Sequence, residues 1–226
     1  MPSIRPAAVA GTFYPAHRTE LRSAIAELCR LAPADSEGSP APKALIVPHA
    51  GYRYSGGVAA AAYACLSPVR DRITRVVLLG PVHRVALRGL ALPGVDAMST
   101  PLGAIPLDRQ AIEALADLPQ VVTSPAAHAG EHSLEVQLPF LQVILADGFR
   151  LVPLAVGGAS AAEISEVLDR LWGGPETLIV VSSDLSHYLP YAVAVREDRV
   201  TADDIVALQP VPQALLEHAL HAQNGM

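Results

Sequence analysis

Residues 45–52 read Leu45-Ile46-Val47-Pro48-His49-Ala50-Gly51-Tyr52. The apolar run at the start is typical of a buried strand, and a proline, a histidine and a glycine follow it directly. In an open α/β sheet, ligands bind just beyond the carboxyl ends of the strands. The stretch therefore predicts an α/β fold in which His49 lies where chemistry takes place rather than in the packed core.

Two later apolar runs end in the same way. One is Val76-Val77-Leu78-Leu79-Gly80-Pro81-Val82-His83, and the other is Leu178-Ile179-Val180-Val181-Ser182-Ser183-Asp184-Leu185-Ser186-His187. The carboxyl ends of parallel strands meet at one edge of a sheet. We therefore expect His49, His83 and the pair Asp184 and His187 to gather on one rim.

The composition of the 226-residue chain restricts its class. Hydrophobic residues make up 51% and the mean hydropathy is +0.33, which is enough for a sizeable core. A net charge of −6 without a basic block argues against nucleic acid or an anionic membrane surface as a partner. No apolar run approaches the roughly 20 residues of a membrane helix, and we expect no signal peptide. Cys29 and Cys65 indicate no disulfide framework, so we expect a cytoplasmic protein.

Strand and helix patterns alternate along the chain. We expect strands over 44–47, 75–79, 89–92, 120–123, 149–156 and 177–181, and helices over 19–31, 55–66, 108–118, 131–147, 160–171, 201–208 and 213–222. Pro139 should kink or restart the helix over 131–147. We expect an extended arm over 4–15, and loops or irregular chain over 32–42, 95–107 and 124–130. This alternation predicts a single α/β domain over 1–226, with a mixed, largely parallel central sheet flanked by helices.

His49 and His83 are the candidate metal ligands. Neutral imidazole suits Fe, Zn, Cu and Ni, and two histidines leave room for a third protein ligand and for substrate. The spacing matches no tight metal signature such as HExxH. A pair of loop histidines hydrogen-bonded to the backbone therefore stays open as the alternative.

His132, Asp184 and His187 are the candidate acid–base residues. A carboxylate three residues before a histidine can orient the imidazole, act as a base or complete a metal site, while capping of the next helix is the alternative. His132 can donate a proton into the same cleft, and Glu131 before it would favour a helix dipole. The other histidines are expected at the surface, namely His17, His128, His218 and His221.

Tyr52, Tyr54 and Tyr188 lie within a few residues of these histidines, so they are the candidate substrate-binding residues. Packing is the more common role for a tyrosine and remains the alternative. No G-x-S-x-G elbow surrounds the serines at 182, 183 and 186, which disfavours a serine hydrolase. The glycines form neither a P-loop nor a dinucleotide fingerprint.

Five segments, taken in order, resemble the Memo family, whose bacterial members are often called AmmeMemoRadiSam system protein B. They are Arg5-Pro6-Ala7-Ala8-Val9-Ala10-Gly11-Thr12-Phe13-Tyr14-Pro15, Pro48-His49-Ala50-Gly51-Tyr52-Arg53-Tyr54-Ser55-Gly56, Gly80-Pro81-Val82-His83, Glu131-His132-Ser133-Leu134-Glu135-Val136-Gln137-Leu138-Pro139-Phe140-Leu141 and Ser182-Ser183-Asp184-Leu185-Ser186-His187. The match runs from Arg5 to about Asp204. It implies a fold similar to the class III extradiol ring-cleaving dioxygenases, which are non-haem Fe(II) enzymes.

The resemblance also implies a site and its partners. The family's cleft contains residues that correspond to His49, His83, His132, Asp184 and His187. Metal-binding members use the first two histidines and a cysteine near the C-terminus, and they bind iron or copper. AMMECR1-like and radical SAM proteins are expected partners by family association, with a small-molecule ligand or a peptide in the cleft.

The chain departs from the family pattern at its C-terminal end. Ala207-Leu208-Gln209-Pro210 stands where the family carries Cys-Gly, so the third protein ligand to Fe(II) or Cu is not identified. The C-terminus also looks shortened by a final strand. An exposed sheet edge would favour self-association, so a homo-oligomer is an expectation.

Three functions follow from these observations. The first is a non-haem, Fe- or Cu-dependent redox protein or dioxygenase-like enzyme, with His49 and His83 as ligands and His132, Asp184 and His187 as acid–base groups. The second is a non-catalytic binding or accessory protein whose cleft holds a small anion or peptide, the metal site being lost with the cysteine. The third is a zinc hydrolase, which needs a complete third ligand.

Overall fold

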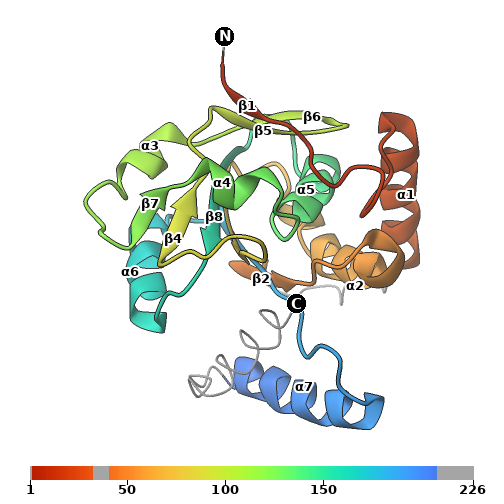
Figure 1. Ribbon diagram of the computed structural model, residues 1–226. Coiled ribbons are helices and arrows are strands. Elements are labelled where there is room, and N and C mark those ends of the chain that lie inside the picture. The colour runs from red at the N-terminus through yellow and green to blue at the C-terminus, as the bar shows by residue number, and fades with distance from the viewer. Residues whose placement is uncertain (1, 33–40, 208–226) are drawn as a thin grey trace. The chain divides into compact units, whose positions relative to one another are not determined.

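Six strands form the central sheet of the structure, which is a computed structural model that describes residues 2–32 and 41–207 (Figure 1). They are β2 (Ala44–Val47), β3 (Arg75–Pro81), β4 (Leu90–Leu92), β7 (Val121–Thr123), β8 (Arg150–Val156) and β9 (Thr177–Ser182). The strand order is β2-β9-β3-β8-β4-β7. Strands β2, β9, β3 and β8 are parallel to one another. Strand β4 is antiparallel to β8, and β7 is parallel to β4. The prediction of a mixed, largely parallel sheet is therefore confirmed.

Contacts within the chain divide it into two units, Met1–Ser183 and Asp184–Met226. The central sheet lies in the first unit. The described part of the second unit contains one helix, α7 (Tyr191–Val206), where a helix was expected over 201–208. The expectation of a single domain over 1–226 stays a prediction. The helix predicted over 213–222 and most of the loop predicted over 32–42 lie outside the described residues.

Helices cover both faces of the sheet (Figure 1). The helices and 3-10 turns of the first unit are α1 (Arg18–Leu31), α2 (Tyr52–Ala64), η1 (Ser67–Val69), α3 (Arg109–Glu113), α4 (Pro125–Ala129), η2 (Glu135–Gln137), α5 (Leu138–Ile144) and α6 (Ala161–Leu171). Successive strand residues point to opposite faces. Val76 and Leu78 of β3 belong to the core under α1, α2 and α5, whereas Val77 and Leu79 belong to the core under α3 and α6.

A second, three-stranded sheet ties the N-terminal arm to the first unit. It consists of β1 (Ile4–Arg5), β5 (Ala97–Thr100) and β6 (Gly103–Pro106), with β5 and β6 antiparallel. The prediction of irregular structure over 95–107 is therefore wrong. The turn-forming residues lie at the hairpin turn and strand ends, and Gly103 supplies the positive φ of +134° there.

Two other local predictions need correction. The loop expected over 124–130 contains α4, because the Ser124 side chain accepts a hydrogen bond from the Ala127 amide and Pro125 occupies the first turn. The helix expected over 131–147 is shorter, because residues 131–134 are not helical and α5 begins only at Leu138, with Pro139 in its first turn. The helix predicted over 160–171 is present as α6, and Ser160 forms a capping box with Glu163 at its start.

Candidate metal centre

Three histidine rings meet beyond the carboxyl ends of β2 and β3. His49 follows β2, His83 follows β3, and His132 lies in the loop before η2. One ligand nitrogen from each lies within 4.8 Å of those of the other two. The ring centroids are 4.5 Å apart for His83 and His132, and 5.3 Å apart for His49 and His83. Nitrogen donors at such separations can share one metal ion.

The strand order explains why His49 and His83 meet. Strand β9 lies between β2 and β3, and all three strands are parallel. Both histidines therefore emerge at the same edge of the sheet, on either side of the end of β9. The register pairs Val47 with Ser182, so Ser182 lies at this edge beside His49.

Gly80 allows the loop that carries His132 to reach β3. A Cβ atom on Gly80 would lie 3.0 Å from Leu134 Cδ2, 3.0 Å from Ser133 Oγ and 3.2 Å from Ser182 Cβ. Such contacts are tight for any side chain, so glycine permits the close approach. The Ser133 hydroxyl then donates a hydrogen bond to the Pro81 carbonyl at 2.7 Å. The loop is thereby fastened to the end of β3, and His132 lies against His83.

His132 is the third histidine of this cluster. It was predicted as an acid–base residue, with the third metal ligand unidentified. In the structure its ring stacks on that of His83, and its donor nitrogen joins those of His49 and His83. His132 therefore has the geometry of a third ligand. Its acid–base role stays a prediction.

Glu131 holds two of the three histidines. This buried carboxylate lies 2.9 Å from Nδ1 of His83 and 3.2 Å from Nδ1 of His132. It also accepts hydrogen bonds from the backbone amides of His83, His132 and Ser133. Burial alone would raise the pKa of Glu131, but the hydrogen bonds from His83 and the backbone amides lower it to about 2. The carboxylate is thus ionised and orients the imidazoles, a role other than the helix-dipole role considered from the sequence.

His49 is held by a different group. Its Nδ1 lies 3.2 Å from the hydroxyl oxygen of Ser182, which is itself buried. Ser182 also contacts the side chain of Gln137 and the carbonyl of Ser133. Ser182 was considered only as a weak hydrolase nucleophile, and Gln137 was given no role. Neither residue type signals such a function until the strand order is known.

Phe13 brings the N-terminal arm to the histidines. Its ring centroid lies 4.6 Å from that of His132, and its carbonyl accepts a hydrogen bond from the Tyr52 amide. The arm was expected to be extended, and no site residue was predicted in it. An aromatic ring at the rim of the histidine cluster makes one wall of the site apolar.

The three candidate tyrosines lie in different surroundings. Tyr52 is buried, and its hydroxyl donates to the Val136 carbonyl at 2.7 Å, which is the packing role considered as the alternative. Tyr54 is 81% exposed at the start of α2. Tyr188 lies in the second unit with Asp184 and His187, whose Oδ2 and Nε2 atoms are 3.7 Å apart. Substrate binding by these tyrosines, and catalysis by Asp184 and His187, stay predictions.

His128 contradicts its predicted place at the surface. It is only 1% exposed, and its Nε2 lies 2.8 Å from the Ala91 carbonyl. Burial lowers the pKa of His128 to about 4, so the ring is neutral at pH 7. The reason is that α4, expected as a loop, packs His128 inward against β4. His17 is exposed as predicted, and His218 and His221 lie outside the described residues.

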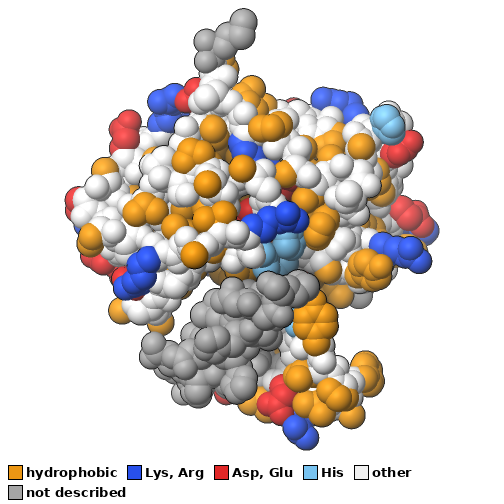
Figure 2. All heavy atoms as spheres, in the orientation of Figure 1, with side chains coloured by type: hydrophobic (Ala, Val, Ile, Leu, Met, Phe, Trp, Pro, Cys, Tyr) orange, Lys and Arg blue, Asp and Glu red, His pale blue; other side chains and the backbone are white. Residues whose placement is uncertain are grey.

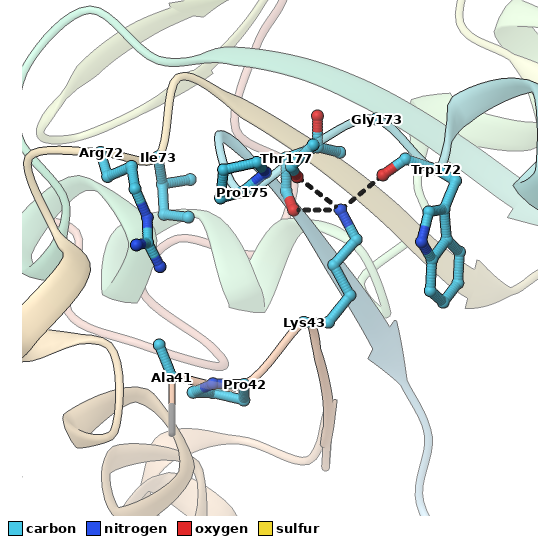
Figure 3. A pocket seen from close by; sticks show the side chains of 10 residues that line it. Ala41, Pro42, Lys43, Arg72, Ile73, Trp172, Gly173, Pro175 and Thr177 are labelled. Carbon is cyan, nitrogen blue, oxygen red and sulfur yellow. Dashed lines mark hydrogen bonds between the residues drawn. The ribbon is translucent and has the colours of Figure 1, made fainter. Parts of the chain in front are cut away.

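A cavity of about 260 Å³ lies at the opposite edge of the sheet (Figure 3). Its lining residues directly precede β2, β3 and β9 and include Lys43, Arg72 and Trp172. The ammonium group of Lys43 donates to the carbonyls of Trp172, Gly174 and Thr177. These hydrogen bonds use all three donors of the lysine. Lys43 therefore joins the segments at the amino edge, away from the histidines.

Histidine side chains reach the surface in the middle of one face of the molecule, beside lysine or arginine side chains (Figure 2). His83 and His132 are partly exposed, whereas His49 is buried. Within the cluster, the rings of His83 and His132 are therefore less covered than that of His49. Among the described helices, none is long and apolar enough to span a membrane.

The chain is similar to known proteins over nearly its whole length. The family described as Memo-like protein matches residues 5–223. A MEMO1 family protein of Ignicoccus hospitalis is 40% identical over 225 residues, which cover 92% of this chain and 77% of that protein. MEMO1 family proteins of Aquifex aeolicus and Methanopyrus kandleri are each 37% identical. The aligned segments cover 87% and 90% of this chain, and 72% and 76% of the respective relatives.

Proposed function

Since the chain belongs to the Memo-like protein family, we propose that it is a metal-dependent redox protein whose metal ion is bound by His49, His83 and His132. The observation that carries this proposal is the meeting of three imidazoles beyond the carboxyl ends of parallel strands. The expected ion is Fe(II) or Cu. The place expected for a cysteine ligand is taken in this proposal by His132.

The donor set supports the proposal. Three neutral imidazoles suit Fe, Cu and Zn, and a three-ligand set leaves coordination positions open for substrate. The Nδ1 atoms of His83 and His132 face the ionised Glu131 carboxylate. A proton on Nδ1 that is shared with a carboxylate leaves the lone pair of the neutral ring on Nε2, which is the usual arrangement in protein metal sites. The residues present therefore fit a metal ion.

The residues around the histidines define what the protein itself contributes. Glu131 fixes the orientation of two ligands and adds one negative charge next to the site. Phe13 excludes water from one side of His132 and offers an apolar ring to a bound substrate. A bound Fe or Cu would supply redox chemistry and a positive charge that attracts an oxygen donor of the substrate.

Oxygen uptake tests the redox part of the proposal. The protein should be purified without oxygen, loaded with Fe(II) or Cu in separate samples, and mixed with catechol and O₂. We expect oxygen uptake by at least one loaded sample of the unmutated protein and a loss of that uptake in His132→Ala. His17→Ala serves as the matched control, because His17 is exposed and distant in sequence from the cluster.

Other outcomes contradict the redox proposal. Tight binding of zinc alone, without oxygen uptake in any loaded sample, would favour hydrolytic chemistry. A folded protein that retains no metal would favour the binding or accessory function. In that case the cleft should be searched with small anions and peptides.

A further inference from the structure

A buried chain of hydrogen bonds leads from the core to His49. The hydroxyl of Tyr63 contacts Oε1 of Gln137 at 3.0 Å. The side-chain nitrogen of Gln137 lies 2.9 Å from the Pro48 carbonyl and 2.9 Å from the Ser182 hydroxyl. The Ser182 hydroxyl lies 2.6 Å from the Ser133 carbonyl and 3.2 Å from Nδ1 of His49.

Two backbone carbonyls determine the direction of every hydrogen bond in this chain. A carbonyl oxygen can only accept. The amide NH₂ group of Gln137 must therefore face the Pro48 carbonyl, which leaves its oxygen toward Tyr63. The hydroxyl of Ser182 must donate its single proton to the Ser133 carbonyl, since two oxygens 2.6 Å apart need a proton between them.

The remaining lone pairs of Ser182 can then only accept. One accepts from the Gln137 amide, and the other faces Nδ1 of His49. Nδ1 of His49 must therefore be the nitrogen that carries the proton. In a neutral imidazole the lone pair then lies on Nε2. The direction of this bond follows from groups that cannot reverse, rather than from the histidine itself.

We propose that Ser182 and Gln137 are positioning residues that lock His49 into its Nδ1–H tautomer, so that Nε2 is ready to bind a metal ion. Isolated imidazole populates both tautomers, and a ligand that must change tautomer binds more weakly. The inference rests on the proposed function for its purpose, although the tautomer itself is a property of the metal-free chain. Glu131 holds His83 and His132, so the two networks together prepare all three ligands from outside the cluster.

The tautomer can be measured directly in the metal-free, full-length protein. Uniformly ¹⁵N-labelled protein at pH 8 should show the two ring nitrogens of His49 in long-range ¹H–¹⁵N correlation spectra, assigned with His49→Gln. We expect a single species with the proton on Nδ1. A single Nε2–H species, or a mixture of both tautomers, in the unmutated protein would overturn the proposal without any need for a variant.

Two serine variants test the cause. Ser182→Ala should give a mixture of tautomers and weaken Zn²⁺ binding, measured by competition with a chelator, by about tenfold. Ser55→Ala is the control, because it removes a serine hydroxyl that donates to the Ala50 carbonyl and lies outside this chain of hydrogen bonds. It should leave His49 as the Nδ1–H tautomer.

The outcomes separate this proposal from the proposed function. An unchanged tautomer in Ser182→Ala would contradict the lock even if metal binds normally. Conversely, a locked His49 in a protein that binds no Zn²⁺, Fe(II) or Cu would contradict the metal function and leave the lock intact.

Discussion

Glu131 and Glu135 lie four residues apart and are both buried, yet they perform different tasks. The carboxylate of Glu135 accepts hydrogen bonds from the guanidinium of Arg5, the backbone amides of Ala8 and Val9, and the hydroxyl of Tyr14. It thereby anchors the N-terminal arm. Among the described residues, the carboxylate of Glu131 pairs with no arginine or lysine; it faces two imidazoles and three backbone amides, while the backbone carbonyl of Glu131 accepts a hydrogen bond from Arg5.

The comparison shows that the partners of a buried carboxylate reveal its role better than its burial does. The positive charge of Arg5 compensates the negative charge of Glu135 within the core, so Glu135 needs no ligand to balance its charge. The partners of the Glu131 carboxylate are three backbone amides and two imidazoles, and each imidazole has a second ring nitrogen that can bind a metal ion. The contacts therefore distinguish Glu131, which orients imidazoles, from Glu135, which anchors the N-terminal arm. The following variants test that distinction.

Glu135→Gln should have the largest effect on stability. The change leaves the buried Arg5 guanidinium without its carboxylate, and breaking a buried pair in this way costs about 3–5 kcal/mol of unfolding free energy. Urea unfolding at pH 7.5 measures the loss. The binding of Zn²⁺ to the folded fraction should remain close to that of the unmutated protein. A loss below about 1 kcal/mol would contradict the anchor role.

Acid should weaken the same anchor through His128, whose carbonyl accepts two hydrogen bonds from Arg5. Burial lowers the pKa of this histidine from 6.5 to about 4, so between these values the unfolded chain binds the extra proton. The free energy of unfolding is therefore unaffected by His128 above pH 6.5 and decreases as the pH falls toward 4. The total decrease from this one histidine is about 3 kcal/mol.

Unfolding curves between pH 7.5 and pH 4 test this prediction when the unmutated protein is compared with His128→Gln. Other groups titrate equally in both proteins, so the difference isolates His128. The variant should lose less stability on acidification. Parallel pH curves for the two proteins would refute the assignment.

Tyr14→Phe should have an intermediate effect. Its hydroxyl donates to Glu135 at 2.6 Å, and burial together with Glu135 raises the pKa of Tyr14 well above its ordinary value. Hydrogen bonds to charged groups contribute about 1.5–3 kcal/mol. Thermal or urea unfolding should show a loss in that range, whereas Tyr54→Phe, at an exposed tyrosine, should show none.

Glu131→Gln should distinguish the two carboxylates most clearly, because it should lower metal affinity more than stability. The amide cannot hold both imidazoles as an ionised carboxylate does, so Zn²⁺ affinity should fall tenfold to a hundredfold, or about 1.4–2.7 kcal/mol of binding free energy. Chelator competition measures this. Stability should fall less than in Glu135→Gln, because no arginine is left unpaired. An unchanged Zn²⁺ affinity would remove Glu131 from the site.

Much of the central fold could be predicted from local patterns. The apolar strands, the mixed sheet and the capping by Ser160 and Asp108 follow from hydrophobic runs and side-chain chemistry that act over a few residues. The hairpin of β5 and β6 was missed because its prolines and glycine, which punctuate a hairpin, resemble those of an irregular loop. Residues 124–130 were predicted as a loop for a similar reason. Because the helix α4 was not expected there, His128 was wrongly predicted to lie at the surface.

The histidines of the candidate site could be predicted where they follow a strand or belong to a recognisable motif. His49 and His83 satisfy the first condition, and His132 was singled out through its motif. The roles of Glu131, Ser182 and Gln137 depend on β9 lying between β2 and β3 and on the close approach that Gly80 permits. These are long-range arrangements, and no periodicity or spacing within one segment encodes them.

The metal content of the protein tests the central claim most directly. Protein purified without oxygen should be analysed for metals beside His49→Ala, His83→Ala, His132→Ala and the control His17→Ala. The account predicts about one Fe or Cu ion per chain in the unmutated protein and the control. That ion should be lost in each of the three cluster variants. Metal far below one per chain in a folded, unmutated protein, or full metal content in His132→Ala, would contradict the three-histidine site.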